Sequence, residues 1–268
     1  MTSISKQRIN SIDLLKGLAM VIMAIDHVRD YFHYSAFIFD PADPTQSNLP
    51  VFFTRLITHF CAPIFSFLAG VSAFMVGRRK TKKELSSFLI KRGIWLIFLE
   101  LTIIGFGWFF DFHFRTFVFV TIWSLGISML FLAAMIHLPR TLILCICLAL
   151  IGGHNLLDNV HFDGSIIWAS LHEFNMFKIN ETTSLLVGYP VIPWIAIMSL
   201  GYYFGNYYDN NFDSQVRKKI FNRIGIISIS LFLILRFTNF YGDAYPFTKF
   251  GSVTKDIISF FNPTKYPP

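Results

Sequence analysis

The amino-acid sequence predicts an all-α integral membrane protein, a polytopic bundle of about seven transmembrane helices. Three observations lead to this prediction. Hydrophobic residues make up 54% of the 268 residues and charged residues only 15%, whereas soluble domains carry roughly 25% charged residues. The apolar residues gather in stretches of about the 20 residues that cross a bilayer. The positively charged residues lie in clusters between these stretches, as they do in proteins with several spans.

Seven apolar stretches define the predicted spans, which cover residues 12–32, 51–76, 88–110, 117–136, 141–153, 185–203 and 224–240. The first is a retained helix rather than a signal peptide, because it lacks a small-x-small cleavage site and ends among charged residues. The second contains Pro63, which predicts a kink. The fifth is short and is therefore expected to be tilted or partly re-entrant. No repeat or linker divides the chain, so we expect a single domain over residues 1–268.

The positive residues predict the orientation of the bundle. With seven spans and a cytoplasmic N-terminus, the clusters fall on one side, in agreement with the positive-inside rule. They are Lys6 and Arg8; residues 78–92, with Arg78, Arg79, Lys80, Lys82, Lys83, Lys91 and Arg92; Arg140; and Arg217, Lys218, Lys219 and Arg223. The net charge of +7 thus reflects topology rather than nucleic-acid binding. The outer side receives residues 34–50, the turn near Asp111, residues 154–184 and the tail after Tyr241, where we expect any chemistry.

Several kinds of site are not predicted. Cys61, Cys145 and Cys147 lie within apolar runs, so we expect plain thiols and no disulfide. Histidines and carboxylates between residues 154 and 173 match no standard zinc spacing, so no metal is predicted. The chain also has no Walker loop, no GxSxG elbow and no dinucleotide fingerprint.

The first helix carries ionisable residues that need a reason within a membrane. Asp13, Lys16 and His27 fall near one face, and Asp13 and Lys16 are spaced to form an ion pair. His27 lies about 21 Å from Asp13 along a helix that rises about 1.5 Å per residue, near the outer boundary. A histidine there can act as a general base if a carboxylate orients it.

Two readings of this outer end remain open. In one, Asp26 or Asp30 orients His27 for catalysis. In the other, Asp26 and Arg29 form an interfacial ion pair and His27 has no role.

The second and third helices carry further polar candidates. Arg55 and His59 are four residues apart and share a helical face, so they can hold a carbonyl, a phosphate or a sugar hydroxyl, or serve only as interfacial anchors. Glu100 lies in the middle of the third span, where we expect a structural partner such as Arg115 or a hydroxyl, with a proton relay as the alternative.

The order of several motifs resembles a known family. The opening Ser11-Ile-Asp13-Leu-Leu-Lys16-Gly17, leading to Asp26-His27, is similar to the first helix of the transmembrane acyltransferase superfamily. The closer resemblance is to bacterial proteins of the heparan-alpha-glucosaminide N-acetyltransferase catalytic-domain type, and it spans nearly the whole chain. It is carried by Thr58-His59-Phe-Cys-Ala-Pro63, Phe67-Leu-Ala-Gly70, Ile122-Trp123-Ser-Leu-Gly126, His154-Asn155-Leu-Leu-Asp158, Tyr189-Pro-Val-Ile-Pro-Trp194, Leu200-Gly-Tyr-Tyr, Tyr241-Gly-Asp243 and Asn262-Pro-Thr-Lys265-Tyr-Pro-Pro.

The resemblance implies a membrane-bound enzyme that moves an acetyl or similar acyl group from acetyl-CoA or another acyl-CoA to a sugar hydroxyl or amine at the outer face. His27 corresponds to the suspected general base of the O-acyltransferase branch. The glucosaminide branch has an asparagine there and a histidine in the segment that follows, for which His33 is the nearest candidate. Lys16 stands where relatives have arginine, and it loses the fork geometry of that side chain.

The residue patterns and the resemblance together give the expected roles. Catalysis is expected at His27, Asp26, Asp30 and His33. Binding of the saccharide is expected at Arg55, His59, His154, Asn155, Asp158 and Trp194, and binding of the acyl-CoA at Asp13 and Lys16. Relatives usually continue past the last motif into further apolar helices, so we expect a C-terminally incomplete domain. The expected location is the bacterial cytoplasmic (inner) membrane.

Two other functions fit the sequence. In a proton-coupled transporter or permease, Asp13, Glu100 and the histidines would relay protons, although no inverted halves or matched broken helices are seen. The other is a non-catalytic membrane protein.

Overall fold

The computed structural model describes residues 9–262 except residues 35, 37, 210–211 and 244. Lys6, Arg8 and the motif residues after Asn262 lie outside the described residues. The helices are α1 (Asn10–Phe32), α2 (Leu49–His59), α3 (Cys61–Gly77), α4 (Lys82–Leu99), α5 (Gly105–Phe109), α6 (Thr121–Met135), α7 (Arg140–Gly153), α8 (Ile166–His172), α9 (Ile192–Phe204), α10 (Ser214–Thr238) and α11 (Val253–Phe260). A π-helical turn, η1 (Glu100–Ile104), joins α4 to α5, and 3-10 turns η2 (His154–Leu157) and η3 (Gly205–Tyr208) extend α7 and α9.

Among the residues that the structure describes, three helical segments are long and apolar enough to cross a membrane: Leu49–Gly77, Arg140–Leu157 and Ser214–Thr238. They correspond to the second, fifth and seventh predicted spans. The apolar helix α6 has 15 residues and α9 has 13, fewer than the 17 to 25 residues typical of a spanning helix. Helix α1 is longer, but it carries Asp13, Lys16, Asp26, Arg29 and Asp30. By length and composition, the structure thus supports three spans and does not confirm seven.

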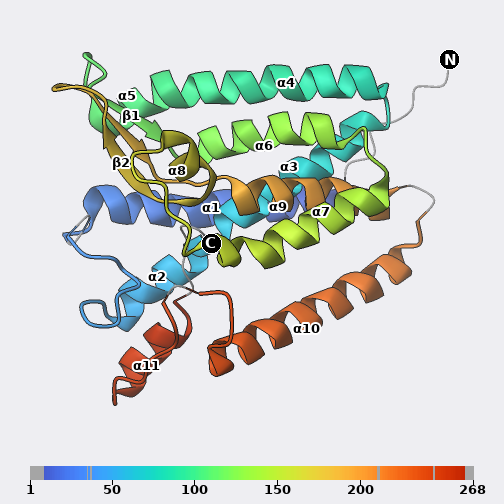
Figure 1. Ribbon diagram of the computed structural model, residues 1–268. Helices are drawn as coiled ribbons and strands as arrows, with labels where there is room; N and C mark the ends of the chain where they lie inside the picture. Colours follow the sequence, from blue (N-terminus) through green and yellow to red (C-terminus); the bar gives the residue numbers. More distant parts are fainter. Residues whose placement is uncertain (1–8, 35, 37, 210–211, 244, 263–268) are drawn as a thin grey trace.

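The long helices run back and forth along one direction, as Figure 1 shows for α3, α4, α6, α7, α9 and α10. This arrangement gathers basic residues at one end of the bundle, which we call the basic end. There Arg78 lies 3.2 Å from Asp209, and the Arg140 guanidinium lies 5.9 Å from the ring centre of Tyr203. Arg217 donates to the Tyr207 carbonyl at 3.2 Å. The predicted one-sided clustering of charge is therefore seen in the arrangement of the helices.

The opposite end, the sheet end, carries a small β-sheet that the all-α prediction missed. Its strands β1 (Thr116–Phe119), β2 (Asn175–Lys178) and β3 (Ser184–Val187) pair in the order β1-β3-β2, parallel between β1 and β3 and antiparallel between β3 and β2. The fourth and sixth predicted spans therefore begin with strand rather than helix.

A physical reason explains this correction in the sixth predicted span. Proline lacks a backbone N–H and is tolerated in the first turn of a helix. Pro193 stands at the start of α9, and the apolar residues before it pair with β1 instead of extending the helix.

The second predicted span is broken as expected from Pro63. Helix α2 ends at His59 and α3 begins at Cys61. Because Pro63 has no N–H to donate to the carbonyl of residue 59, the regular ladder is interrupted there. The predicted kink is confirmed.

Helix α9 lies at the centre of the bundle and packs against α3, α6 and α7. Two glycines allow the backbones of α3 and α9 to meet. A Cβ at Gly70 would overlap the Met198 carbonyl, and a Cβ at Gly201 would overlap the Phe67 carbonyl. This close approach is typical of small residues at helix interfaces in membranes.

Glu100 is fully buried and caps a neighbouring helix. Its carboxylate accepts a hydrogen bond from the backbone N–H of Trp123 at 2.8 Å, in the first turn of α6. Arg115, the partner expected from the sequence, instead donates to Asp111 at 2.8 Å. Glu100 thus has a structural partner as expected, but the partner is a backbone N–H rather than Arg115 or a hydroxyl, because a helix N-terminus offers unpaired N–H groups.

Candidate functional site

The sheet end holds most of the predicted site residues, and five of them fall in two groups of polar side chains. We call the first, at the end of α1 and along α2, the α1–α2 cluster; it consists of Asp26, Arg29, Asp30, Arg55 and Thr58. The second, which we call the histidine cluster, consists of His154, Asp158 and His172. Among the residues that the structure describes, no hydrogen bond or ion pair joins the two groups.

The α1–α2 cluster is built around the carboxylate of Asp26. Arg29, one helical turn further on, forms an ion pair with it, and the Thr58 hydroxyl donates to the same oxygen at 2.8 Å. Arg55 lies 3.8 Å from it, and Arg29 also lies 3.5 Å from Asp30. The ion pair between Asp26 and Arg29, which one of the two interpretations of the sequence contained, is formed; the role of His27 is not decided by it.

The two guanidinium groups keep donors that can hold a ligand. Arg29 is only 9% exposed. The Nε atoms of both Arg29 and Arg55 are buried, with no hydrogen-bond partner among the described residues. A buried N–H gains most from an acceptor such as a carbonyl oxygen or a developing oxyanion. The cluster can thus hold an oxygen-rich group.

His27 lies on a different face of α1 from Asp26, because successive residues of an α-helix are about 100° apart. Its exposed imidazole packs 5.9 Å from the ring of Trp108, on which Tyr31 also stacks. Within the described part of the chain, His27 makes no hydrogen bond, so neither Asp26 nor Asp30 orients it as expected. The assignment of His27 as a base stays a prediction.

His33, the alternative base, follows the end of α1, and its ring lies 4.6 Å from that of Tyr34. His59 ends α2, one turn beyond Arg55, and is half-buried.

Trp194 lies in the first turn of α9 and is buried. Its ring packs 4.9 Å from Tyr189, and its carbonyl accepts from Ser66 at 3.2 Å. The indole N–H is buried and has no partner among the described residues. It is therefore a further donor for an oxygen ligand at this end of the bundle.

The histidine cluster joins two distant segments. His172 Nε2 lies 3.0 Å from Asp158 Oδ1, and the Asn155 amide donates to the other carboxylate oxygen at 3.1 Å. The rings of His154 and His172 are 6.0 Å apart and both are buried. The family resemblance grouped His154, Asn155 and Asp158 in one motif and gave them a role in binding the saccharide. His172 was only one of several histidines and carboxylates further along the chain, and the tertiary structure selects it by bringing α8 against this turn.

The residues predicted for the acyl donor lie toward the other end of α1. Lys16 donates to the Ser72 hydroxyl of α3 at 2.8 Å, and Asp13 is exposed. The predicted ion pair between Asp13 and Lys16 is not formed, because Lys16 faces α3, which packs along α1.

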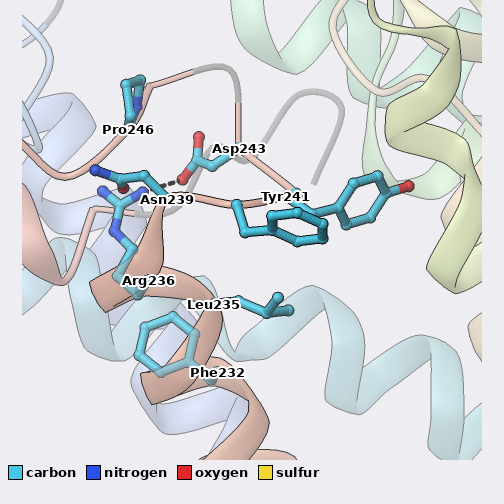
Figure 2. Close-up of a pocket in the computed structure, with 9 residues that line it drawn as sticks. Phe232, Leu235, Arg236, Asn239, Tyr241, Asp243 and Pro246 are labelled. Carbon is cyan, nitrogen blue, oxygen red and sulfur yellow. Dashed lines mark hydrogen bonds and ion pairs between the residues drawn. The ribbon is translucent and has the colours of Figure 1, made fainter.

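A cavity of about 250 Å³ lies at the end of α10 and contains none of the predicted site residues. It is lined by Phe232, Leu235, Arg236, Asn239, Phe240, Tyr241, Gly242, Asp243 and Pro246. Figure 2 shows the Arg236 guanidinium pointing to Asp243, 2.6 Å away. Arg236 also donates to the carbonyls of Tyr245, Ser259, Phe260 and Asn262. Its donors hold the C-terminal segment, so the role of Arg236 is structural.

Comparison with known proteins gives one match. The sequence model of the family described as "Heparan-alpha-glucosaminide N-acetyltransferase, catalytic" matches residues 8–236. No curated protein and no solved structure matches the chain.

Proposed function

Because the chain belongs to the heparan-alpha-glucosaminide N-acetyltransferase catalytic family, we propose that it moves an acetyl or similar acyl group from acyl-CoA to a sugar hydroxyl or amine at the outer face of a membrane. The family match over residues 8–236 carries this proposal. The mostly helical fold with three apolar helices supports a membrane acetyltransferase-like activity. We further propose that the basic end faces the cytoplasm of a bacterium, and that the remaining predicted spans also cross the membrane.

The acceptor reacts at the sheet end in this proposal. His27 removes a proton from the sugar hydroxyl or amine, whose lone pair attacks the carbonyl carbon of the thioester. The attack gives a tetrahedral intermediate, whose collapse breaks the carbon–sulfur bond and releases the CoA thiolate. The Nε–H groups of Arg29 and Arg55, which are buried and lie beside Asp26, hold oxygen atoms of the acceptor sugar.

The donor enters from the basic end in this proposal. Phosphate groups bind where positive side chains gather, and Arg79, Lys80, Lys82 and Lys83 are all exposed there. Lys16, fixed by Ser72, lies 11 residues before His27, or about 16 Å along the helix. We propose that Lys16 lines the path along which the acyl-bearing arm of the CoA donor reaches from the basic end to the sheet end.

The test uses the detergent-purified chain with acetyl-CoA. We expect saturable binding of acetyl-CoA and loss of the acetyl group in the presence of an amino-sugar acceptor. His27→Ala should bind the donor normally but react about 10² to 10⁴ times more slowly, the usual contribution of a general base. His113→Ala is the matched control, because His113 is an exposed histidine that belongs to neither the α1–α2 cluster nor the histidine cluster.

The outcomes separate the alternatives. If the folded chain does not bind acetyl-CoA, the acyltransferase proposal fails. Uptake of a solute driven by a proton gradient would favour the transporter. Full turnover in His27→Ala combined with lost turnover in His33→Ala would move the base to His33.

A further inference from the structure

We propose that His154, Asp158 and His172 bind one divalent transition-metal ion, for which Zn²⁺ is the appropriate probe. This site is separate from the acyl-transfer chemistry above and does not depend on it. The spacing along the chain did not predict it, since the third ligand comes from another helix.

The distances between the three side chains suit a shared ion. Their candidate ligand atoms all lie within 4.8 Å of one another. Two ligands at about 2.1 Å from one ion are separated by about 3.0 to 3.4 Å, and His172 Nε2 already lies 3.0 Å from Asp158 Oδ1. The largest separation therefore has to shorten by at most about 1.8 Å.

Local structure holds each ligand in place. His154 and Asp158 are four residues apart on the turn that ends α7, so they share a face. His172 is the last residue of α8. Trp168 lies in the segment between Asp158 and His172 and holds it together, because its indole N–H donates to the Val160 carbonyl at 2.9 Å. The Val191 N–H donates to the Ser170 carbonyl at 3.0 Å and fixes α8 to the start of α9.

Buried nitrogen atoms provide the second, independent observation. His154 is 5% exposed and His172 is 1% exposed. The Nδ1 atom of each ring is buried and has no hydrogen-bond partner in the described residues. Leaving such atoms unpaired costs roughly 1 to 3 kcal/mol each. The unpaired Nδ1 of His154 can give its lone pair to the ion, whereas the Nδ1–H of His172 lies outside the ligand set, because Nε2 of that ring faces Asp158.

The donor set selects the class of ion. Two imidazole nitrogens with one carboxylate oxygen suit zinc and its first-row neighbours, whereas Mg²⁺ and Ca²⁺ prefer oxygen ligands alone. Asn155 donates to the free oxygen of Asp158 at 3.1 Å, and so orients the carboxylate as an outer-shell residue does. Three protein ligands leave a position for water or a substrate oxygen.

The experiment measures metal binding directly. The full purified chain is stripped with a chelator, incubated with ZnCl₂, and tested for zinc per chain by mass spectrometry and for thermal midpoint. We expect one zinc per chain and a higher thermal midpoint, with no shift from MgCl₂. Loading with Co²⁺ should give visible absorption bands that Zn²⁺ abolishes.

Variants separate the site from surface binding. Asp158→Asn and His172→Ala should lose the zinc, and Asn155→Ala should weaken zinc binding about 10- to 100-fold through the outer shell. His161→Ala is the control, because His161 is 66% exposed and pairs with Glu173 nearby. If His172→Ala fails to fold, the nearly isosteric Asp158→Asn keeps the test decisive.

Two results would overturn the proposal. The first is a folded wild-type chain that takes up no zinc, which would leave Asp158 and His172 as a hydrogen-bonded pair only. The second is equal zinc content in wild type and Asp158→Asn, which would mean adventitious binding. Neither result bears on acyl transfer, because the readouts need no turnover.

Discussion

Helices α9 and α10 are consecutive apolar α-helices, yet their surroundings are opposite. Seven residues of α9 are buried, from Pro193 to Gly201, and other helices surround it. In α10 only Arg236 is buried, and Figure 1 shows α10 along the outside of the bundle. Hydrophobicity alone does not distinguish the two, because lipid and protein interior accept the same side chains.

What distinguishes them is the shape of their surfaces. Helix α9 meets α3 through Gly70 and Gly201, where no side chain fits. Helix α10 presents large side chains such as Ile226, Ile229 and Leu231, which are more than half exposed. A helix that packs on protein needs a matching surface, whereas one that faces lipid does not. Substitutions should therefore separate the two helices.

The largest effect is expected from Gly201→Val in α9. The new side chain would overlap the Phe67 carbonyl of α3, and a backbone cannot give way as a side chain can. We expect a loss of about 3 kcal/mol, the upper end of the usual cost of overpacking, seen as aggregation in size-exclusion chromatography. Gly225→Ala in α10 is the matched control. No atom lies within 4 Å of its added Cβ, so it should be neutral or stabilising by up to about 1 kcal/mol. Equal effects of the two changes would remove the distinction between these helices.

The next effect concerns the one buried residue of α10. Arg236→Met removes the ion pair with Asp243 and leaves carbonyls of the C-terminal segment without their donor. Breaking a buried pair costs about 3 to 5 kcal/mol, and here we expect the loss to be local. Residues 239–262 should become sensitive to limited proteolysis while the bundle stays folded. Arg223→Met changes an exposed residue of the same helix and should leave the proteolytic pattern unchanged. If Arg223→Met gave the same pattern as Arg236→Met, the role of Arg236 in holding the C-terminal segment would be contradicted.

The smallest effect is expected at the exposed start of α4, a helix that packs on α6 but begins at the surface. Thr81 and Glu84 form a capping box. Two hydrogen bonds to the Glu84 carboxylate lower the pKa of Glu84 below its usual 4.5. The larger contribution comes from the backbone N–H of Thr81 and the smaller one from the Thr81 hydroxyl. A lowered pKa means that the ionised cap stabilises the protein near neutral pH, and that this stabilisation is lost as the pH falls through the folded pKa.

Glu84→Gln should therefore lower the thermal midpoint at pH 7, and this difference from the wild type should shrink as the pH falls through the folded pKa of Glu84. Thr81→Ala should lower the free energy of unfolding by about 1 kcal/mol near neutral pH. In a protein that carries Thr81→Ala, the effect of Glu84→Gln on the thermal midpoint should depend less on pH. A constant difference between wild type and Glu84→Gln across this pH range would show that the carboxylate plays no part in the cap.

Much of the fold could be predicted from local sequence. The apolar runs, the interruption at Pro63 and the clustering of basic residues all depend on neighbours in the chain. The Asp26–Arg29 pair and the unit of His154, Asn155 and Asp158 were also accessible, since helical spacing places residues three and four apart side by side. The motif order was sufficient to predict the family.

Other features were decided only when distant segments met. Residues 117–119 and 185–187 are apolar enough for a helix but pair with each other as strands. Glu100 caps α6 rather than pairing with Arg115, and His172 joins Asp158 across 14 residues. The physical reason is common to these cases. Hydropathy is a local property of the chain, but hydrogen-bond partners, backbone contacts and ligand sets depend on which residues the tertiary structure brings within about 3 Å.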